Sequence, residues 1–348
     1  MLRLPLLLAL GLLLPGLWLA PAAAPAQGFT DSAGRSVDLP AAIERVLPAG
    51  PPAAVLLYAL APEKMVRWVT APSPEAQEFI AEPFHDLPVN GRLTGRGNTA
   101  NLEMVLAMEP DLIHDVGSVD DTYASLADRV QEQTGIPYVL IDGRCDRTPA
   151  TIREVGALLG AEARAEEMAA FAEGALARLE AAIAGIPEDA RPRVYYGRGP
   201  DGLETGLAGS INMEVLGAVG AVNVAEAAGS GGLTNVSIEQ ILAWNPEIII
   251  AQDPGFRDAV VTDPLWAEVD AVKAGRVYGA PNLPFGWFDA PPGINRAIGI
   301  AWLTSILYPE AATGDLRAEV RDFFRLFYHV EIDDAQIDRL LAGSVPAP

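Results

Sequence analysis

Four arginines in this 348-residue chain each follow a glycine, and their side chains could bind an anion. They are Arg92, Arg96, Arg144 and Arg198. Glycine permits a tight backbone turn, and a guanidinium group offers a planar fork of donors to carboxylate or catecholate oxygens. Arg144 and Arg198 come soon after apolar runs that are typical of strands, and open α/β sheets bind ligands beyond the carboxyl ends of their strands. We therefore expect these arginines to line a ligand-binding cleft.

Aromatic side chains are expected beside the arginines. Tyr195 and Tyr196 alternate across one strand, so one should face the core and the other the cleft mouth, and we assign Tyr196 to the cleft. Trp287 and Phe288 come just before a helix that we expect to begin near Ile294. Because that helix has its own apolar face for packing, Trp287 and Phe288 are the residues of this segment that we expect in the cleft.

The histidines and the single cysteine do not form a pattern typical of a metal site or a catalytic site. His85, His114 and His329 lie in separate contexts without an H-x-x-x-H or Cys/His spacing, so we expect no cage of protein ligands around a metal ion. Cys145 cannot form an internal disulfide, and we expect it to be a small buried side chain. The sequence has no Gly-x-Ser-x-Gly elbow, and the glycine-rich stretch 229–232 lacks the lysine of a phosphate loop. These patterns predict binding rather than catalysis.

The elements that must position these residues are short apolar runs that alternate with helical patterns. In the first half of the chain the strand candidates are Arg45–Pro48, Met65–Val69, Asp111–His114 and Tyr138–Ile141. In the second half they are Arg193–Tyr196, Val222–Val224, Glu247–Ala251 and Arg276–Tyr278. Alternating strands and helices are typical of parallel α/β layers, so we expect two α/β units.

One long helix is expected between the two units. Ala161–Ile186 has no proline, and apolar residues recur at three- and four-residue steps from Met168 to Ile186. Such a helix would be roughly 37–40 Å long, enough to cross from one unit to the other. The expected organisation is a signal segment at 1–26, an N-terminal lobe at 27–160, a connecting helix at 161–187 and a C-terminal lobe at 188–348.

A segment of the first unit recurs in the second. Asn101–Ile113 aligns without gaps to Ser237–Ile249. In both copies a capping residue precedes a glutamate by two positions, Leu-Ala follows, and Pro-acid leads into an apolar strand. The glutamates are Glu103 and Glu239, and their recurrence predicts two related lobes that present equivalent helices.

These repeated segments, together with Arg45-Val46-Leu47-Pro48 and Pro51-Pro52, resemble the family of periplasmic binding proteins for ferric siderophores, cobalamin and haem. The resemblance spans roughly Phe29 to Pro309. It implies an α/β fold of two Rossmann-like lobes joined by one long helix, with the ligand cleft between the lobes. In that family the two glutamates pair with arginines of an ABC permease dimer, which implies this role for Glu103 and Glu239. An acid in the first turn of a helix also interacts favourably with the helix dipole, by about 0.3–1 kcal/mol, so a purely local role stays open.

The segment Gly286–Arg296, Gly-Trp-Phe-Asp-Ala-Pro-Pro-Gly-Ile-Asn-Arg, is similar to a signature of a subgroup that handles iron complexes or other metal chelates. The resemblance implies a receptor for a metal chelate, with a ferric siderophore as the leading ligand and no further cofactor. A corrinoid, haem or a nickel chelate stays open as the ligand. A non-transport sensor or a chelate-modifying enzyme on the same scaffold is the alternative from a different class. We expect a monomer.

The N-terminus predicts export. Arg3 precedes an apolar run from Leu4 to Leu19, and small residues ending in Ala24-Pro25-Ala26 follow, which is typical of a cleaved signal peptide. No cysteine follows the run, so we expect a freely diffusing periplasmic protein rather than a lipoprotein. The chain carries 24 Lys and Arg against 46 Asp and Glu, and this net charge of −22 excludes nucleic acid as a partner.

Overall fold

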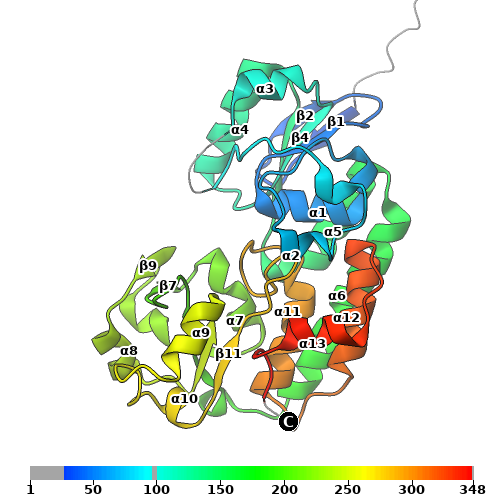
Figure 1. Cartoon of the computed structure of the whole chain (residues 1–348). Helices are drawn as coiled ribbons and strands as arrows, with labels where there is room; N and C mark the ends of the chain where they lie inside the picture. Colours follow the sequence, from blue (N-terminus) through cyan, green and yellow to red (C-terminus); the bar gives the residue numbers. More distant parts are fainter. Residues whose placement is uncertain (1–26, 96–99, 347–348) are drawn as a thin grey trace, which may run out of the picture.

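The computed structural model describes residues 27–95 and 100–346, which form two α/β lobes, one above the other in Figure 1. The N-terminal lobe contains a parallel sheet in the order β3 (Val46–Pro48), β4 (Leu112–Gly117) and β5 (Tyr138–Asp142). A hairpin of β1 (Gln27–Thr30) and β2 (Ser36–Leu39) precedes it.

Helices cover both faces of this first sheet. Helices α1 (Pro51–Leu60) and α5 (Thr148–Leu159) pack on one face, and α3 (Leu102–Ala107) and α4 (Asp121–Thr134) pack on the other. The short helix α2 (Pro74–Gln77) lies between the lobes. Because side chains alternate along a strand and both faces are covered, β4 is buried almost throughout.

The C-terminal lobe repeats this arrangement. Its parallel sheet runs in the order β11 (Val277–Gly279), β10 (Ile248–Ala251), β6 (Arg193–Gly197) and β8 (Val222–Asn223). Helices α8 (Ile238–Trp244), α9 (Pro254–Val260) and α10 (Asp270–Lys273) pack on one face, and α7 (Glu214–Ala218) and α11 (Arg296–Leu307) on the other. Strands β7 (Glu204–Gly206) and β9 (Leu233–Asn235) form a small antiparallel pair.

The predicted fold class, with two lobes and a connecting helix, is confirmed. Helix α6 (Glu162–Ile183) joins the lobes along one side of the molecule (Figure 1). Its buried stripe consists mainly of alanines, so neighbouring helices approach it closely. At Gly156 of α5, an added Cβ would lie 2.2 Å from the Cβ of Ala165, so this contact requires glycine.

Seven of the eight predicted strands are present, and the prediction for Met65–Val69 is wrong. This segment makes only isolated bridges, from Met65 to Val46 and from Trp68 to Val89. A longer parallel ladder with β3 would soon reach Pro48, which has no backbone N–H to donate. The segment therefore lies at the sheet edge as an extended loop.

The last part of the chain packs against both lobes. Helix α12 (Leu316–Phe323) continues into a π-helical turn, Phe324–Tyr328, and α13 (Asp334–Leu341) follows. The ring of Tyr328 stacks on Tyr58 of α1 with centroids 6.4 Å apart, and the hydroxyl of Tyr58 donates to the carbonyl oxygen of Tyr328. The lobes are thus joined by α6 and by the C-terminal segment.

No helix in the part of the chain that the structure describes has the length and apolar character needed to cross a bilayer.

Candidate ligand-binding site

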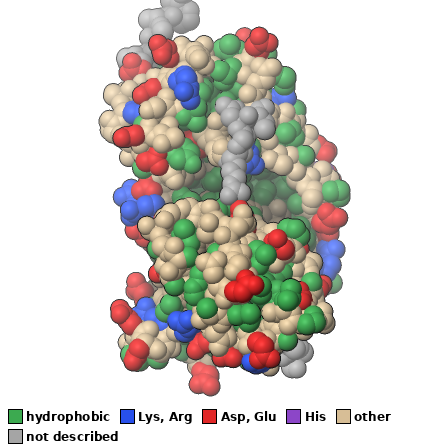
Figure 2. Space-filling model, turned by 90° about the vertical axis from the view of Figure 1, so that its left-hand side faces the viewer, with side chains coloured by type: hydrophobic (Ala, Val, Ile, Leu, Met, Phe, Trp, Pro, Cys, Tyr) green, Lys and Arg blue, Asp and Glu red, His purple; other side chains and the backbone are tan. Residues whose placement is uncertain are grey.

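A cleft of about 1340 Å³ lies between the two lobes, and Figure 2 looks into its mouth. Its floor and walls come from loops at the carboxyl ends of β4, β5, β6 and β11 and from the start of α1. The lobes approach closely at its base, where an added Cβ on Gly293 would lie 3.6 Å from the Cβ of Pro52. Open α/β sheets bind their ligands at the carboxyl ends of their strands, and this cleft lies there.

One wall of the cleft is apolar and aromatic. Trp68 of the first lobe and Phe285 of the second meet there with ring centroids 5.7 Å apart. The indole N–H of Trp68 is satisfied by the carbonyl oxygen of Phe84, at 2.8 Å. Six prolines from both lobes continue this surface, and they are Pro51, Pro52, Pro72, Pro284, Pro291 and Pro292. Proline supplies a rigid apolar surface and has no N–H to donate. This wall therefore favours contact with the carbon-rich parts of a ligand over contact with anionic oxygen atoms.

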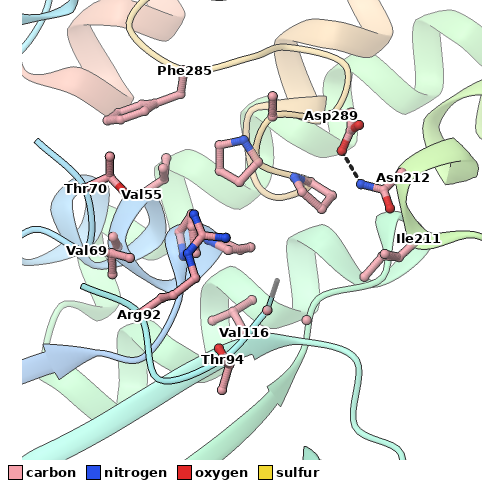
Figure 3. A pocket seen from close by; sticks show the side chains of 18 of the residues that line it. Val55, Val69, Thr70, Arg92, Thr94, Val116, Ile211, Asn212, Phe285 and Asp289 are labelled. Atoms are coloured by element: carbon pink, nitrogen blue, oxygen red, sulfur yellow. Dashed lines mark hydrogen bonds between the residues drawn. The ribbon is translucent and has the colours of Figure 1, made fainter. Parts of the chain in front are cut away.

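Three of the four arginines predicted for the cleft line it. Arg92 points into the cavity from the first lobe (Figure 3). Arg144 lies at the rim, half exposed, and its guanidinium donates to both carboxylate oxygens of Asp146 at 3.1 and 2.7 Å. Arg96 lies outside the described residues.

Two carboxylates hold Arg198 in place. Its side chain is 13% exposed, its Nε lies 2.8 Å from Oδ2 of Asp289, and its Nη1 donates to Glu204. Asp289 is almost fully buried and also accepts a hydrogen bond from Nδ2 of Asn212 (Figure 3). Burial raises the pKa of Asp289, and the nearby charge of Arg198 opposes this rise. Two carboxylates therefore fix the orientation of Arg198 at the cleft.

Asp115 forms a second buried acidic position, on the first lobe. It follows His114 in β4 and accepts hydrogen bonds from the hydroxyls of Thr94 and Tyr138, both at 3.1 Å, and from the N–H of Val116 at 3.0 Å. Burial raises the pKa of Asp115 to about 6, and these hydrogen bonds oppose the rise. Burial also raises the pKa of Tyr138 well above its usual range, so Tyr138 stays a neutral donor.

The structure places three predicted cleft residues in the core instead. Tyr196, Trp287 and Phe288 are at most 1% exposed, and none of them lines the cleft. Tyr196 stacks on Phe288 with centroids 4.0 Å apart, because helices cover both faces of β6 and leave neither face at the cleft mouth. The loop with Trp287 packs directly on α11, since an added Cβ on Gly299 would lie 2.0 Å from the carbonyl oxygen of Trp287.

Sequence reasoning missed Asp115, Asn212, Glu214 and Asp289. Asp115 could have been predicted, because it directly follows the predicted strand Asp111–His114, much as Arg144 follows the predicted strand Tyr138–Ile141. Asp289 lies in the Trp-Phe-Asp segment, where the prediction assigned only the two aromatic residues to the cleft. Asn212 and Glu214 follow no strand and have no motif, so only the fold brings them to the cleft.

Glu214 links the lobes at the side of the cleft. Its Oε2 accepts from the N–H of Cys145 in the first lobe at 2.8 Å and from Nη1 of Arg296 in α11 at 3.2 Å. Arg296 is 1% exposed and also donates to the carbonyl oxygen of Ile211. Cys145 is buried, as predicted, and burial raises the pKa of its thiol.

The histidines do not gather at the cleft. His114 is fully buried within β4, and burial lowers its pKa to about 4. His329 packs edge-on against Tyr58, and His85 lies beside Asp86. Within residues 27–95 and 100–346 there is no group of three or more His, Cys, Asp or Glu side chains that could hold a metal ion.

Comparisons with known proteins place the chain in a family. The family described as "Periplasmic binding protein" matches residues 56–283. The molybdate-binding protein MolA of Haemophilus influenzae is 29% identical over 262 residues, which are 69% of this chain and 73% of the relative.

Solved structures show the same fold. An ABC transporter solute-binding protein from Sulfurospirillum deleyianum has 30% sequence identity and a TM-score of 0.80, and the match covers 90% of this chain and 98% of that one. Haemophilus influenzae MolA bound to molybdate superimposes with a TM-score of 0.71 at 23% identity, over 88% of this chain and 99% of that one. The chain therefore belongs to the periplasmic binding protein family and is a solute-binding protein of the ABC-transporter type.

Proposed function

We propose that this protein captures a metal complex of an organic chelator in the cleft between its lobes and delivers it to an ABC permease. The observation that carries this proposal is the pairing of an apolar, proline-lined wall with guanidinium groups at the strand ends. Such a surface suits a ligand with carbon faces and a few anionic oxygens. A ferric siderophore is the leading ligand, and a corrinoid, haem or a nickel chelate would use the same features.

The size of the cleft supports an organic chelate over a bare ion. Ligand pockets commonly measure about 300–1,000 Å³, and this cleft is larger, at about 1340 Å³. A tetrahedral oxyanion needs the room of a few water molecules, each of which takes up about 30 Å³ in the liquid. An oxyanion would leave most of the apolar, proline-lined wall of the cleft uncovered.

Molybdate is the second candidate, because a relative 29% identical to this chain is a molybdate-binding protein. For this ligand the lobes would have to close around an ion at Arg198 and Arg92. Both candidates are metal complexes with anionic oxygens, and one set of titrations separates them.

The test is a titration of the purified protein with ferric enterobactin, cobalamin, haem, a nickel–histidine complex and sodium molybdate, followed by tryptophan fluorescence and calorimetry. Because Trp68 lies at the cleft wall, we expect one organic chelate to quench its fluorescence with one site per chain. Replacement of Trp68 with Phe should remove most of this signal while one-site binding persists in calorimetry. Tight binding of molybdate alone would overturn the organic chelate, and chemical turnover of any chelate would overturn the assignment as a receptor.

The proposal includes export and docking. Residues 1–26 lie outside the described residues, and we propose that they direct the chain to the periplasm.

Glu103 and Glu239 are exposed at the first turns of α3 and α8, which lie on different lobes (Figure 1). We expect them to pair with basic residues of the permease. Changing both to Gln should abolish uptake and leave the affinity for the ligand within a few-fold.

A further inference from the structure

Each lobe exposes the same short pattern of side chains on equivalent helices. Along 101–107 and 237–243 the order of exposed, half-buried and buried positions is identical. Val105 and Ile241 anchor the two helices, and both are fully buried. The two copies thus point matching residues at solvent.

Two of the matching residues are large and apolar. Leu106 is 45% exposed and Leu242 is 37% exposed, and they occupy aligned positions of the repeat. Scattered exposed leucines are common on protein surfaces and need no explanation singly. A leucine exposed at equivalent sites of both lobes, while the exposed positions 101 and 104 differ from their counterparts 237 and 240, indicates a shared contact.

Glutamate, leucine and alanine form one surface on each helix. Glu103, Leu106 and Ala107 are spaced i, i+3 and i+4, which places them on one face, and the second copy has the same spacing. We name these faces the α3 face (Glu103, Leu106, Ala107) and the α8 face (Glu239, Leu242, Ala243). Each face combines a charge with an apolar spot, so its partner must offer a basic group beside an apolar socket.

We propose that Leu106 with Ala107 and Leu242 with Ala243 insert into two equivalent apolar sockets on the two subunits of a twofold-symmetric membrane permease. This inference rests on the proposed function and adds to it the residues that provide the apolar contact. Two alike faces require two alike sites, which a symmetric dimer supplies. The glutamates guide the encounter, and the leucines slow dissociation once water is excluded from the contact.

The test compares binding of the full-length mature protein to its cognate ABC permease, reconstituted with its ATPase in nanodiscs. The variant carries Leu106→Ser and Leu242→Ser together. We expect its dissociation constant to rise at least tenfold through faster dissociation, with an unchanged dependence on salt. Glu103→Gln with Glu239→Gln should instead slow association and flatten the salt dependence. Leu265→Ser is the matched control, since Leu265 is 64% exposed on the second lobe and lies outside the repeat.

Several outcomes would overturn the inference. One is binding of the double serine variant within twofold of the wild type, and another is an equal loss in Leu265→Ser. A changed oligomeric state of the double variant, measured by light scattering, would assign the faces to contacts between copies of this chain. A wild-type protein that does not bind the permease would overturn the proposed function itself, whereas wild-type binding that survives the double change overturns only the role of the leucines.

Discussion

At the scale of single residues, Arg198 lines the cleft with a guanidinium group that two carboxylates hold in one orientation. Glu204 and Asp289 hold its guanidinium, so little side-chain freedom remains to be lost on binding. The same arrangement makes the stability of the fold sensitive to changes at Arg198, because Asp289 is 1% exposed and its charge is compensated by the arginine.

We expect Arg198→Ala to weaken ligand binding at least tenfold and to lower the free energy of unfolding by about 3 kcal/mol, since it leaves a buried carboxylate without its cation. Adding Asp289→Asn should restore most of the stability without restoring the affinity. Urea denaturation and calorimetry of the single and double variants measure both effects. Equal stability of Arg198→Ala and wild type would mean that Asp289 does not depend on Arg198.

Asp115 predicts a dependence of stability on pH. Its pKa in the folded protein is raised to about 6, so folding disfavours its ionised form. Its contribution is therefore fully present below the unfolded pKa, near 3.8, and is lost as pH rises through 6. Between pH 4.5 and pH 7 wild type should lose about 2 kcal/mol relative to Asp115→Asn. A difference between the two proteins that is constant across this range, measured by urea denaturation, would contradict the raised pKa.

At the scale of elements, close helix packing explains where glycine is required. Gly156 in α5 and Gly174 in α6 are both helical, but only Gly156 faces another helix at contact distance. We expect Gly156→Ala to lower the free energy of unfolding by about 1–3 kcal/mol through overpacking against Ala165. Gly174→Ala should raise it by up to about 1 kcal/mol, because alanine favours the helix and the only close atom belongs to the flexible Arg178. Thermal unfolding of both variants tests the opposite signs.

Elements were predictable from the sequence where a local pattern determines them. Helix α6 has a long uninterrupted apolar stripe, and the repeated capping residue, glutamate and Leu-Ala pattern predicts both α3 and α8. The orientation of side chains was less predictable. Tyr196 was assigned to the cleft from strand alternation, but a parallel sheet buried on both faces places neither side of the strand at the ligand. Asn212 reaches the cleft only through tertiary packing, which no spacing in the sequence encodes.

At the scale of the whole molecule, the C-terminal segment adds to the restraint that α6 places on the lobes. Besides α6, the C-terminal segment carries Tyr328 and His329 to α1 of the first lobe, where Nε2 of His329 lies 3.1 Å from the carbonyl oxygen of Tyr58. Farther along, Gln336 donates to Glu78 at 2.9 Å. One covalent connection and one packed segment restrain hinge opening more than a single linker would. We therefore expect ligand binding to move loops and to change the angle between lobes only slightly.

Replacing Tyr58 with Phe tests the packed connection. The hydroxyl of Tyr58 donates to the carbonyl oxygen of Tyr328 and accepts from the N–H of Ala81, so its loss frees one buried and one half-buried backbone group. Tyr308→Phe is the matched control, because the buried hydroxyl of Tyr308 donates to Val219 within the second lobe. Both changes should lower the free energy of unfolding by about 1–3 kcal/mol.

Only Tyr58→Phe should alter the position of the lobes. Spin labels at Asp121 in α4 and Asp258 in α9, on opposite lobes, should give one narrow distance distribution in wild type and in Tyr308→Phe. In Tyr58→Phe the distribution should broaden in the absence of ligand and narrow when the ligand is bound. The affinity should fall as well, because a smaller fraction of the ligand-free protein then has the closed arrangement that binds the ligand. Identical distributions in all three proteins would show that the hydroxyl of Tyr58 does not restrain the lobes.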